Sequence, residues 1–282
     1  MRIKTLANLL FMIPILNASA QSGYSLELQI KTQPTEKITV NETGLGVTFF
    51  ENIDSKNKIT NTFRYKNTEV NYPLENYDLQ NNLNHFTSFE NDFEFSHQVT
   101  EKTKLNLEIN PTVNFENNLG ISDISLLGGF EVNHSINPTN TIRFGVKRMM
   151  LFGKPELLPT FSFYHQINPS AFLEVGFPNT VISYSNTSRN RFRFTNSFNG
   201  NYYNLDRPSV LNDLNEATKV SFSQITTAIE YERNMDANWF ITLKGGYESN
   251  KKYQLINPSG DSKFDLNSSN GYILSIGIKY KQ

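Results

Sequence analysis

Cysteine is absent from the 282-residue sequence. Its absence excludes disulfide bonds, catalysis by a thiol and metal sites built on cysteine. It also excludes an N-terminus held in a membrane by a lipid attached to a cysteine side chain. The fold must therefore be stabilised by backbone hydrogen bonds and side-chain packing.

An excess of either charge is also lacking. The sequence has 26 Lys and Arg against 27 Asp and Glu, which gives a formal net charge of −1. A nucleic-acid-binding protein needs a clustered basic excess to contact phosphates. The composition therefore predicts no nucleic acid among the partners.

Long apolar runs are missing after the N-terminal segment, so no later segment is a candidate for a membrane-spanning helix. The mean hydropathy is −0.46, yet 13% of the residues are aromatic, with 22 Phe and 13 Tyr beside a single Trp. A transmembrane β-barrel combines these two properties, because its outward side chains face lipid while its inward side chains face water.

The N-terminus has the pattern of a secretory signal peptide. Two basic residues, Arg2 and Lys4, precede an uncharged apolar stretch, and the small residues Ala18-Ser19-Ala20 follow it. This order is typical of a segment that is removed on export, so we expect cleavage after Ala20. The sequence then divides into a signal peptide at 1–20 and one exported domain at 21–282.

Apolar and polar residues alternate through the exported domain. In the first such segment, residues 24, 26, 28 and 30 are apolar and every residue between them is polar. Successive side chains of a strand point to opposite faces, so each of these segments predicts a strand with one apolar face. Further segments of this kind lie at 105–115, 124–132, 142–150, 161–167, 171–177, 192–198, 239–247 and 272–280.

Stretches rich in Asn, Asp, Ser and Pro separate the strands, as expected for turns. We expect tight turns at 53–56, 99–101, 137–139, 168–170, 188–190 and 234–236. Longer connections are expected at 32–41, 69–82, 116–122, 151–157, 204–218 and 250–270. The two classes alternate, which is typical of an outer-membrane barrel with short periplasmic turns and longer outer loops.

This pattern predicts an all-β fold, an antiparallel transmembrane β-barrel of about 14 strands. Twelve strands remain an alternative, because the connection at Pro178-Asn179 is very short and the alternation changes parity near Ser223, as it does at a bulge. A soluble β-sandwich also alternates. It rarely needs so many aromatic residues at strand ends, so the barrel is favoured.

The inward faces of the predicted strands carry charges of both signs. A lumen lined in this way fits a water-filled, weakly selective pore, and it equally fits a lumen closed by ion pairs. The candidate lumen-lining residues are Glu27, Arg64, Lys66, Glu108, Glu131, Arg143, Lys147, Glu174, Arg191, Arg193, Lys244, Glu248 and Lys279.

Catalytic residues are not apparent among the four histidines, His85, His97, His134 and His165. His134 is followed by Ser135, but neighbouring residues of a strand point to opposite faces and cannot easily form a nucleophile–base pair. No set of His and carboxylates has the spacing of metal ligands. We therefore predict a non-enzymatic protein without a cofactor or a metal site.

A series of short motifs lies between residues 152 and 205. They are Phe152-Gly153-Lys154-Pro155-Glu156-Leu157-Leu158-Pro159, Tyr164-His165-Gln166-Ile167-Asn168, Gly176-Phe177-Pro178, Tyr184, Arg189 and Asn199-Gly200-Asn201-Tyr202-Tyr203-Asn204-Leu205. In this order they resemble the DUF6268 family, outer-membrane β-barrel proteins of unknown function found in the Bacteroidetes. The resemblance extends more weakly across the exported domain. It implies a barrel in the cell envelope, and it brings no established activity and no catalytic residues.

Three functions follow as hypotheses. The leading one is a porin-like outer-membrane barrel that passes or binds small solutes through its polar lumen. The alternative is a structural or interaction barrel that presents its outer loops to partners or to lipopolysaccharide. A barrel enzyme is the third, and the absence of a catalytic set counts against it. In each case the expected partners include outer-membrane lipid, lipopolysaccharide and the machinery that assembles barrels.

Overall fold

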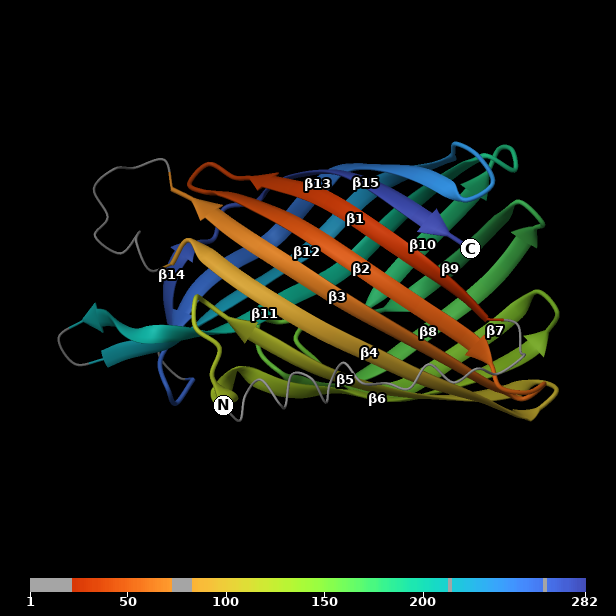
Figure 1. Ribbon diagram of the computed structural model, residues 1–282, viewed down its shortest axis with the longest axis horizontal. Helices are drawn as coiled ribbons and strands as arrows, with labels where there is room; N and C mark the ends of the chain where they lie inside the picture. Colours follow the sequence, from red (N-terminus) through yellow and green to blue (C-terminus); the bar gives the residue numbers. More distant parts are fainter. Residues whose placement is uncertain (1–21, 73–82, 213–214, 261–262) are drawn as a thin grey trace.

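The computed structural model describes residues 22–72, 83–212, 215–260 and 263–282 (Figure 1). The predicted signal peptide at 1–20 lies outside these ranges. Strands make up nearly all of the described chain, and they run obliquely around one closed barrel (Figure 1). Within the described ranges, no helix is long and apolar enough to cross a membrane.

The strands follow one another with short gaps. The first seven are β1 (Ser22–Pro34), β2 (Thr39–Asn52), β3 (Asn57–Asn71), β4 (His85–Thr100), β5 (Thr103–Phe115), β6 (Ile124–Asn137) and β7 (Asn140–Met149). The others are β8 (Glu156–Asn168), β9 (Ala171–Phe177), β10 (Asn179–Ser185), β11 (Asn190–Asn212), β12 (Asn215–Asn234), β13 (Trp239–Ile256), β14 (Lys263–Asn267) and β15 (Gly271–Lys281). One turn of 3-10 helix, η2 (Ile121–Asp123), precedes β6.

Fourteen of these strands form the barrel. Each strand from β1 to β13 pairs with the next, β13 pairs with β15, and β15 pairs with β1. The short β14 lies outside the ring and pairs only with the end of β13. The predicted number of strands is therefore confirmed, and the alternative of twelve is wrong.

Both irregular places in the sequence lie within this ring. A single residue, Pro178, connects β9 to β10, and both strands are seven residues long. The parity change near Ser223 is not a change of face, because even-numbered side chains of β12 are buried on both sides of it, Val220 and Phe222 before it and Thr226 and Ala228 after it. The apolar residues before Ser223 face inward instead. A register shift does occur between Ser223 and Ile225 in the pairing of β12 with β13. The partner strand accommodates the shift at Asn250, whose φ of 51° lies in the left-handed region that Asn tolerates.

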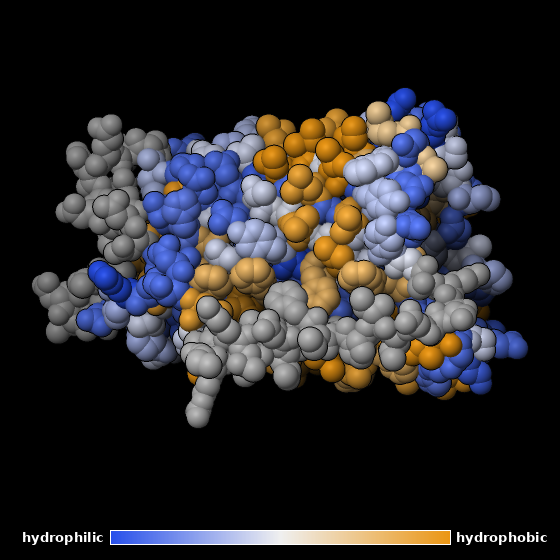
Figure 2. All heavy atoms as spheres, viewed as in Figure 1, coloured by the Kyte–Doolittle hydropathy of each residue, from blue (hydrophilic) through white to orange (hydrophobic). Residues whose placement is uncertain are grey.

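The outer surface of the barrel is apolar. Leu26, Leu28 and Ile30 of β1 are 42%, 47% and 54% exposed, while the polar residues between them turn inward. The apolar side chains form a band across the middle of the barrel, with hydrophilic residues at both ends (Figure 2). Aromatic residues gather at strand ends, and Trp239 and Tyr24 both contact Tyr280. This inside-out arrangement is the one that a bilayer requires.

The connections at the two ends differ, although the links at 35–38 and Pro178 are as short as those at the opposite end. At one end, which we call the short-turn end, the links are residues 53–56, 101–102, 138–139, 169–170, 186–189 and 235–238. At the other, the long-loop end, they include 72–84, 116–123, 150–155 and 257–270.

Three of the expected long connections are largely strand. Of the stretch at 32–41, only residues 35–38 link β1 to β2. β11 and β12 continue as a paired hairpin through most of the stretch at 204–218, and this hairpin projects beyond the barrel (Figure 1). β13 continues to Ile256, and β14 occupies part of the stretch at 250–270. The prediction of loops was wrong here because these strand extensions are rich in Asn, Asp and charged residues, a composition that is typical of loops.

The barrel narrows at its long-loop end. β9 and β10 end early, and above them β11 reaches β5, where Asn204 pairs with Phe115. The loop at 150–155 fills the space between. A Cβ atom on Gly200 of β11 would lie 2.0 Å from the carbonyl oxygen of Met150, so only glycine permits this approach. The wall of the barrel therefore has a smaller circumference at the long-loop end than toward the short-turn end.

Candidate functional site

The lumen is the candidate site. The charged residues of the predicted lumen set lie in the ring and alternate with the exposed apolar residues of their strands. They are Glu27 on β1; Arg64 and Lys66 on β3; Glu108 on β5; Glu131 on β6; Arg143 and Lys147 on β7; Glu174 on β9; Arg191 and Arg193 on β11; Lys244 and Glu248 on β13; and Lys279 on β15.

Three ion pairs join members of this set. Lys279 Nζ lies 2.9 Å from Glu27 Oε2. Arg143 Nη1 lies 2.7 Å from Glu174 Oε1, which also accepts a hydrogen bond from Ser162. The third pair joins Lys147 to Glu108 at 2.6 Å. In each pair the partners come from adjacent strands or from strands separated by one neighbour, so these contacts follow the wall and do not cross the lumen.

Other members of the set pair with residues that sequence reasoning missed. Arg64 lies 3.5 Å from Glu90 and 3.7 Å from Asp92, both on β4. The sequence does indicate that Glu90 and Asp92 face inward. The apolar residues 89, 93 and 95 alternate with them and therefore share the opposite, outward face. Arg191 and Arg193 likewise contact two carboxylates on β12, those of Glu230 and Glu232. Lys31 pairs with Glu42 at 2.5 Å, and neither was in the predicted set.

Three charged residues of the set form no ion pair within the part of the chain that the structure describes: Lys66, Glu131 and Lys244. Lys66 instead donates a hydrogen bond to Asn201 Oδ1, at 2.8 Å. Lys66 belongs to β3 and Asn201 to β11, and β4 and β5 lie between these strands where the barrel narrows. This contact therefore spans the narrowed lumen.

An apolar cluster closes the lumen at the long-loop end. Its centre consists of Phe86 on β4, Tyr203 on β11 and Phe222 on β12, with ring centroids 4.8 to 6.0 Å apart. Tyr253 on β13 stacks on Phe222 at 4.2 Å. We call this cluster the plug; its buried members are Ile38, Val40, Val70, Leu83, Phe86, Tyr203, Ala217, Val220, Phe222, Tyr253 and Leu255.

The plug lies where the barrel narrows. β4 and β11 are separated by six strands on either side of the full ring. At this level β11 lies beside β5, so Phe86 and Tyr203 are in contact across one strand and are only 0% and 1% exposed. Polar contacts reinforce the closure, since the hydroxyl groups of Tyr72 and Tyr253 lie 2.8 Å apart and both donate to the Leu83 carbonyl oxygen. The sequence predicted a polar lumen, and at this level the inward side chains are mainly apolar.

A buried ion pair lies next to the plug. Lys251 Nζ is 2.7 Å from Glu248 Oε2, and the two side chains are 1% and 0% exposed. Residues three apart on a regular strand point to opposite faces. The bulge at Asn250 turns both side chains inward, and Glu248 Oε1 also accepts hydrogen bonds from Gln33 and Gln224.

A polar cavity of about 410 Å³ lies beside the wall formed by β15 and β1 to β4. Its lining includes the Lys31–Glu42, Arg64–Glu90 and Lys279–Glu27 pairs and the side chain of Lys66. On β2 and β3 the inward side chains change from Glu42 and Lys66 in this cavity to Val40 and Val70 in the plug. The cavity therefore ends where the plug begins.

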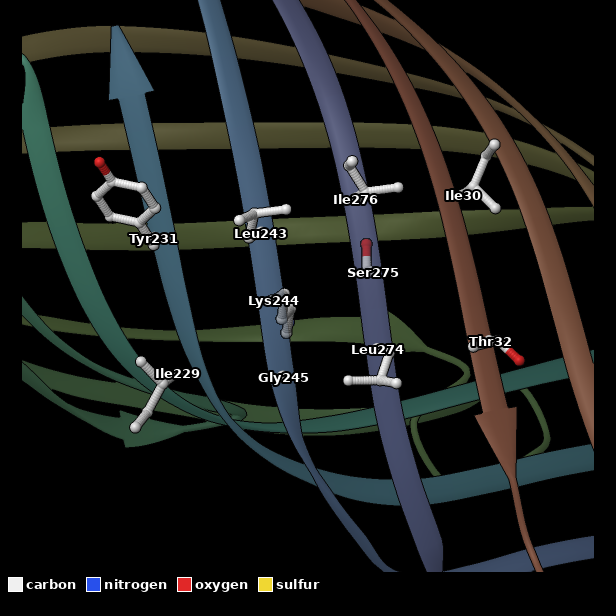
Figure 3. A pocket seen from close by; sticks show the side chains of 10 residues that line it. All are labelled: Ile30, Thr32, Ile229, Tyr231, Leu243, Lys244, Gly245, Leu274, Ser275 and Ile276. Carbon is white, nitrogen blue, oxygen red and sulfur yellow. The ribbon is translucent and has the colours of Figure 1, made fainter.

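A second hollow, of about 590 Å³, lies on the outside of the barrel (Figure 3). Ile229, Leu243, Leu274 and Ile276 surround Gly245, whose missing side chain leaves the depression. These residues belong to the outward apolar rows. The hollow is therefore part of the membrane-facing surface and is separate from the lumen.

Three of the four histidines lie near the short-turn end, whereas His85 begins β4 at the long-loop end. His97 and His165 place Nδ1 2.8 Å and 2.7 Å from side-chain oxygens of Asn57 and Asn140. His134 contacts Thr103, whereas Ser135 contacts Thr141 on the opposite face of the strand. Among the described residues, no group of three His, Asp or Glu side chains is arranged to hold a metal ion.

Comparison with solved structures finds other barrels. The chain is similar to the KdgM porin in complex with disordered oligogalacturonate, with 6% identity, coverage of 91% of this chain and 98% of that chain, and a TM-score of 0.42. It is similar to the NanC porin with 7% identity, 90% and 98% coverage and a TM-score of 0.43. For a Pseudomonas aeruginosa FadL homologue the values are 10% identity, 93% and 89% coverage, and 0.47.

Comparison at the level of sequence gives one family. No curated protein matches the chain. The family model described as "Domain of unknown function (DUF6268)" matches residues 17–281, nearly the whole sequence. The chain therefore belongs to the DUF6268 family.

Proposed function

We propose that the protein is an outer-membrane barrel that admits small polar solutes to its lumen and passes them when the plug is displaced. It is exported by the signal peptide at 1–20 and placed with its short turns in the periplasm, as is usual for such barrels. Membrane lipid and lipopolysaccharide surround the apolar band, and the envelope's assembly machinery inserts the chain. The protein acts without a catalytic residue or a cofactor.

One observation supports passage above the alternatives: the lumen is hollow and polar below the plug, and the plug consists mainly of side chains from the barrel wall. Phe86, Tyr203 and Phe222 each belong to a different strand of that wall. Displacing side chains of the wall requires a smaller rearrangement than removal of a folded domain from a lumen. A hydrophobic constriction of this kind is a known way to gate a pore.

Planar-bilayer recording tests the proposal. We expect rare conductance steps from the natural protein and frequent steps from the variant Phe86→Ala with Phe222→Ala. The matched control is Phe89→Ala with Phe194→Ala, which removes two outward rings that are 40% and 41% exposed, and it should behave like the natural protein. If the plug variant is silent although it folds as a heat-modifiable barrel on gels, passage through the lumen is excluded.

The projecting hairpin of β11 and β12 favours a second function, the presentation of outer loops to a partner. A photoreactive residue at Arg207, which is exposed near the end of β11, tests this in intact cells. A crosslinked product that disappears when the probe is moved to Lys58 at the short-turn end would support presentation. The same products from both positions would exclude it.

A further inference from the structure

We propose that the polar cavity is a binding site for small hydroxylated organic anions, and that Lys66 is the group that recognises their negative charge. This inference rests on the proposed function, because it names the class of solute that the lumen takes. Four features of the cavity support it: its shape, its charge, its neutral polar groups and its link to the plug.

The shape depends on two glycines of β2. Gly44 and Gly46 line the cavity, and a Cβ atom on either would find its nearest neighbour 3.8 Å away. Packing does not require glycine there. In contrast, a Cβ on Gly145 or Gly176 would lie 2.2 Å from a backbone oxygen. The two glycines of β2 therefore hollow the wall, and the resulting volume of about 410 Å³ falls within the ~300–1,000 Å³ typical of small-molecule sites.

The charge of the lining is positive. Its four cationic side chains face three carboxylates, those of Glu27, Glu42 and Glu90, so one positive charge remains (4 − 3 = +1). The salt bridges assign each carboxylate to a cation other than Lys66. Within the described chain, Lys66 is thus the lining cation that forms no salt bridge, with Glu42 and Glu90 acting on it only at longer range. The cavity therefore favours a solute with a single negative charge.

The neutral polar groups of the lining suit hydroxyl groups on the same solute. Ser25, Gln29, Thr48 and Thr62 all lie along the cavity wall. Thr48 and Thr62 face each other across β2 and β3, with their oxygens 3.1 Å apart. Hydroxyl and amide groups both donate and accept hydrogen bonds, as sugar-like hydroxyl groups do.

The link to the plug is the hydrogen bond from Lys66 to Asn201. Asn201 lies two residues before Tyr203 on the same face of β11, so this bond joins β11 to β3 across the narrowed lumen, directly beneath the plug. A carboxylate forms a stronger hydrogen bond with an ammonium group than a neutral amide does. A bound anion therefore competes with Asn201 for Lys66 and weakens the tie that holds β11 against β3.

Calorimetric titration of the folded barrel in detergent tests the site with gluconate as the probe. Sorbitol is the matched neutral compound, since it carries a CH₂OH group in place of the carboxylate. We expect gluconate to bind at least about tenfold more tightly than sorbitol. Lys66→Met should remove this preference, Lys66→Arg should retain most of it, and Gly44→Val should weaken both compounds by filling the cavity.

The control is Lys58→Met, which removes an exposed lysine of the same strand; it should bind gluconate normally. Equal affinities for gluconate and sorbitol in the natural protein, or an unchanged preference in Lys66→Met, would overturn the proposal, as would the absence of gluconate binding. Binding and conductance separate the two proposals. Gluconate binding by a barrel whose plug variants are silent supports the site and excludes passage. Conductance without gluconate binding supports passage and excludes the site.

Discussion

Replacing Lys251 with methionine should destabilise the barrel more than any change to its other lysines, because Lys251 belongs to a fully buried ion pair. Its Nζ is the partner of Glu248 Oε2, whereas the donors from Gln33 and Gln224 both reach Oε1. Methionine fills a similar volume without a charge. The change therefore leaves Glu248 buried with one carboxylate oxygen that has no donor among the described residues.

The magnitude follows from that burial. Loss of a donor from a buried acceptor costs about 1–3 kcal/mol, and more when the acceptor is charged. Breaking a buried ion pair by removal of one partner costs about 3–5 kcal/mol, and this is the decrease that we expect in the free energy of unfolding. Adding Glu248→Gln should recover most of the loss, because the remaining amide is neutral and can still bond with Gln33 and Gln224.

Denaturant unfolding in detergent, followed by the fluorescence of the single tryptophan, Trp239, measures these values. Lys252→Met is the matched control. Lys252 is adjacent in sequence but exposed, so its loss should change stability by less than about 0.5 kcal/mol. If Lys251→Met costs under about 1 kcal/mol, the value of an exposed ion pair, or if the double variant is no more stable than Lys251→Met alone, the described burial is wrong.

Two further predictions concern the wall and the turns. Gly128 has φ of +122°, and a Cβ there would lie 2.2 Å from the Glu108 carbonyl oxygen. Gly128→Ala should therefore lower the free energy of unfolding by at least about 1–3 kcal/mol. Gly44→Ala is the control and should leave it nearly unchanged, so equal losses in the two variants would contradict the prediction. In the turn before β13, hydrogen bonds from the backbone N–H groups of Asn238 and Trp239 lower the pKa of Asp236. A lowered folded-state pKa stabilises the fold above the unfolded pKa of about 3.9, and this stability is lost as the pH falls through the folded value. Asp236→Asn should therefore flatten the dependence of the unfolding midpoint on pH below about 4. An unchanged slope would show that these two hydrogen bonds to Asp236 do not stabilise the turn.

The ring of strands was predictable because it depends on local sequence. A lipid-facing strand must be apolar at every second residue, as residues 26, 28 and 30 are, and this requirement holds for each strand independently. Turn composition is also local, and the positions of the short turns at 53–56, 138–139 and 169–170 followed from it. Both kinds of signal can be read without knowledge of which strands face each other across the barrel.

The plug was not predictable in the same way. Among its central residues, Phe86 lies more than a hundred residues before Tyr203 and Phe222 in the sequence. These residues meet only because the barrel closes and then narrows. They are also apolar residues on inward faces, which contradicts the expectation of a polar lumen. Lys251 was missed for a different reason, since it follows a bulge in a stretch whose composition predicts a loop.

The energy of the plug predicts how rarely the natural channel opens. Opening must expose the rings of Phe86, Tyr203 and Phe222 to water, and a fully buried aromatic ring is worth about 1.5–3 kcal/mol. The three rings together amount to roughly 4.5–9 kcal/mol, which corresponds to an open fraction of roughly one in 10³ to one in 10⁶.

A single ring contributes a factor that recordings can resolve. Phe222→Ala should raise the open fraction by about 10- to 150-fold, with little change in the conductance of each opening, because the polar lumen below is unaltered. Phe194→Ala removes an outward ring and should leave the open fraction unchanged. If instead Phe222→Ala changes the size of the steps and not their frequency, the lumen is already open in the natural protein, and the plug restricts the path without closing it.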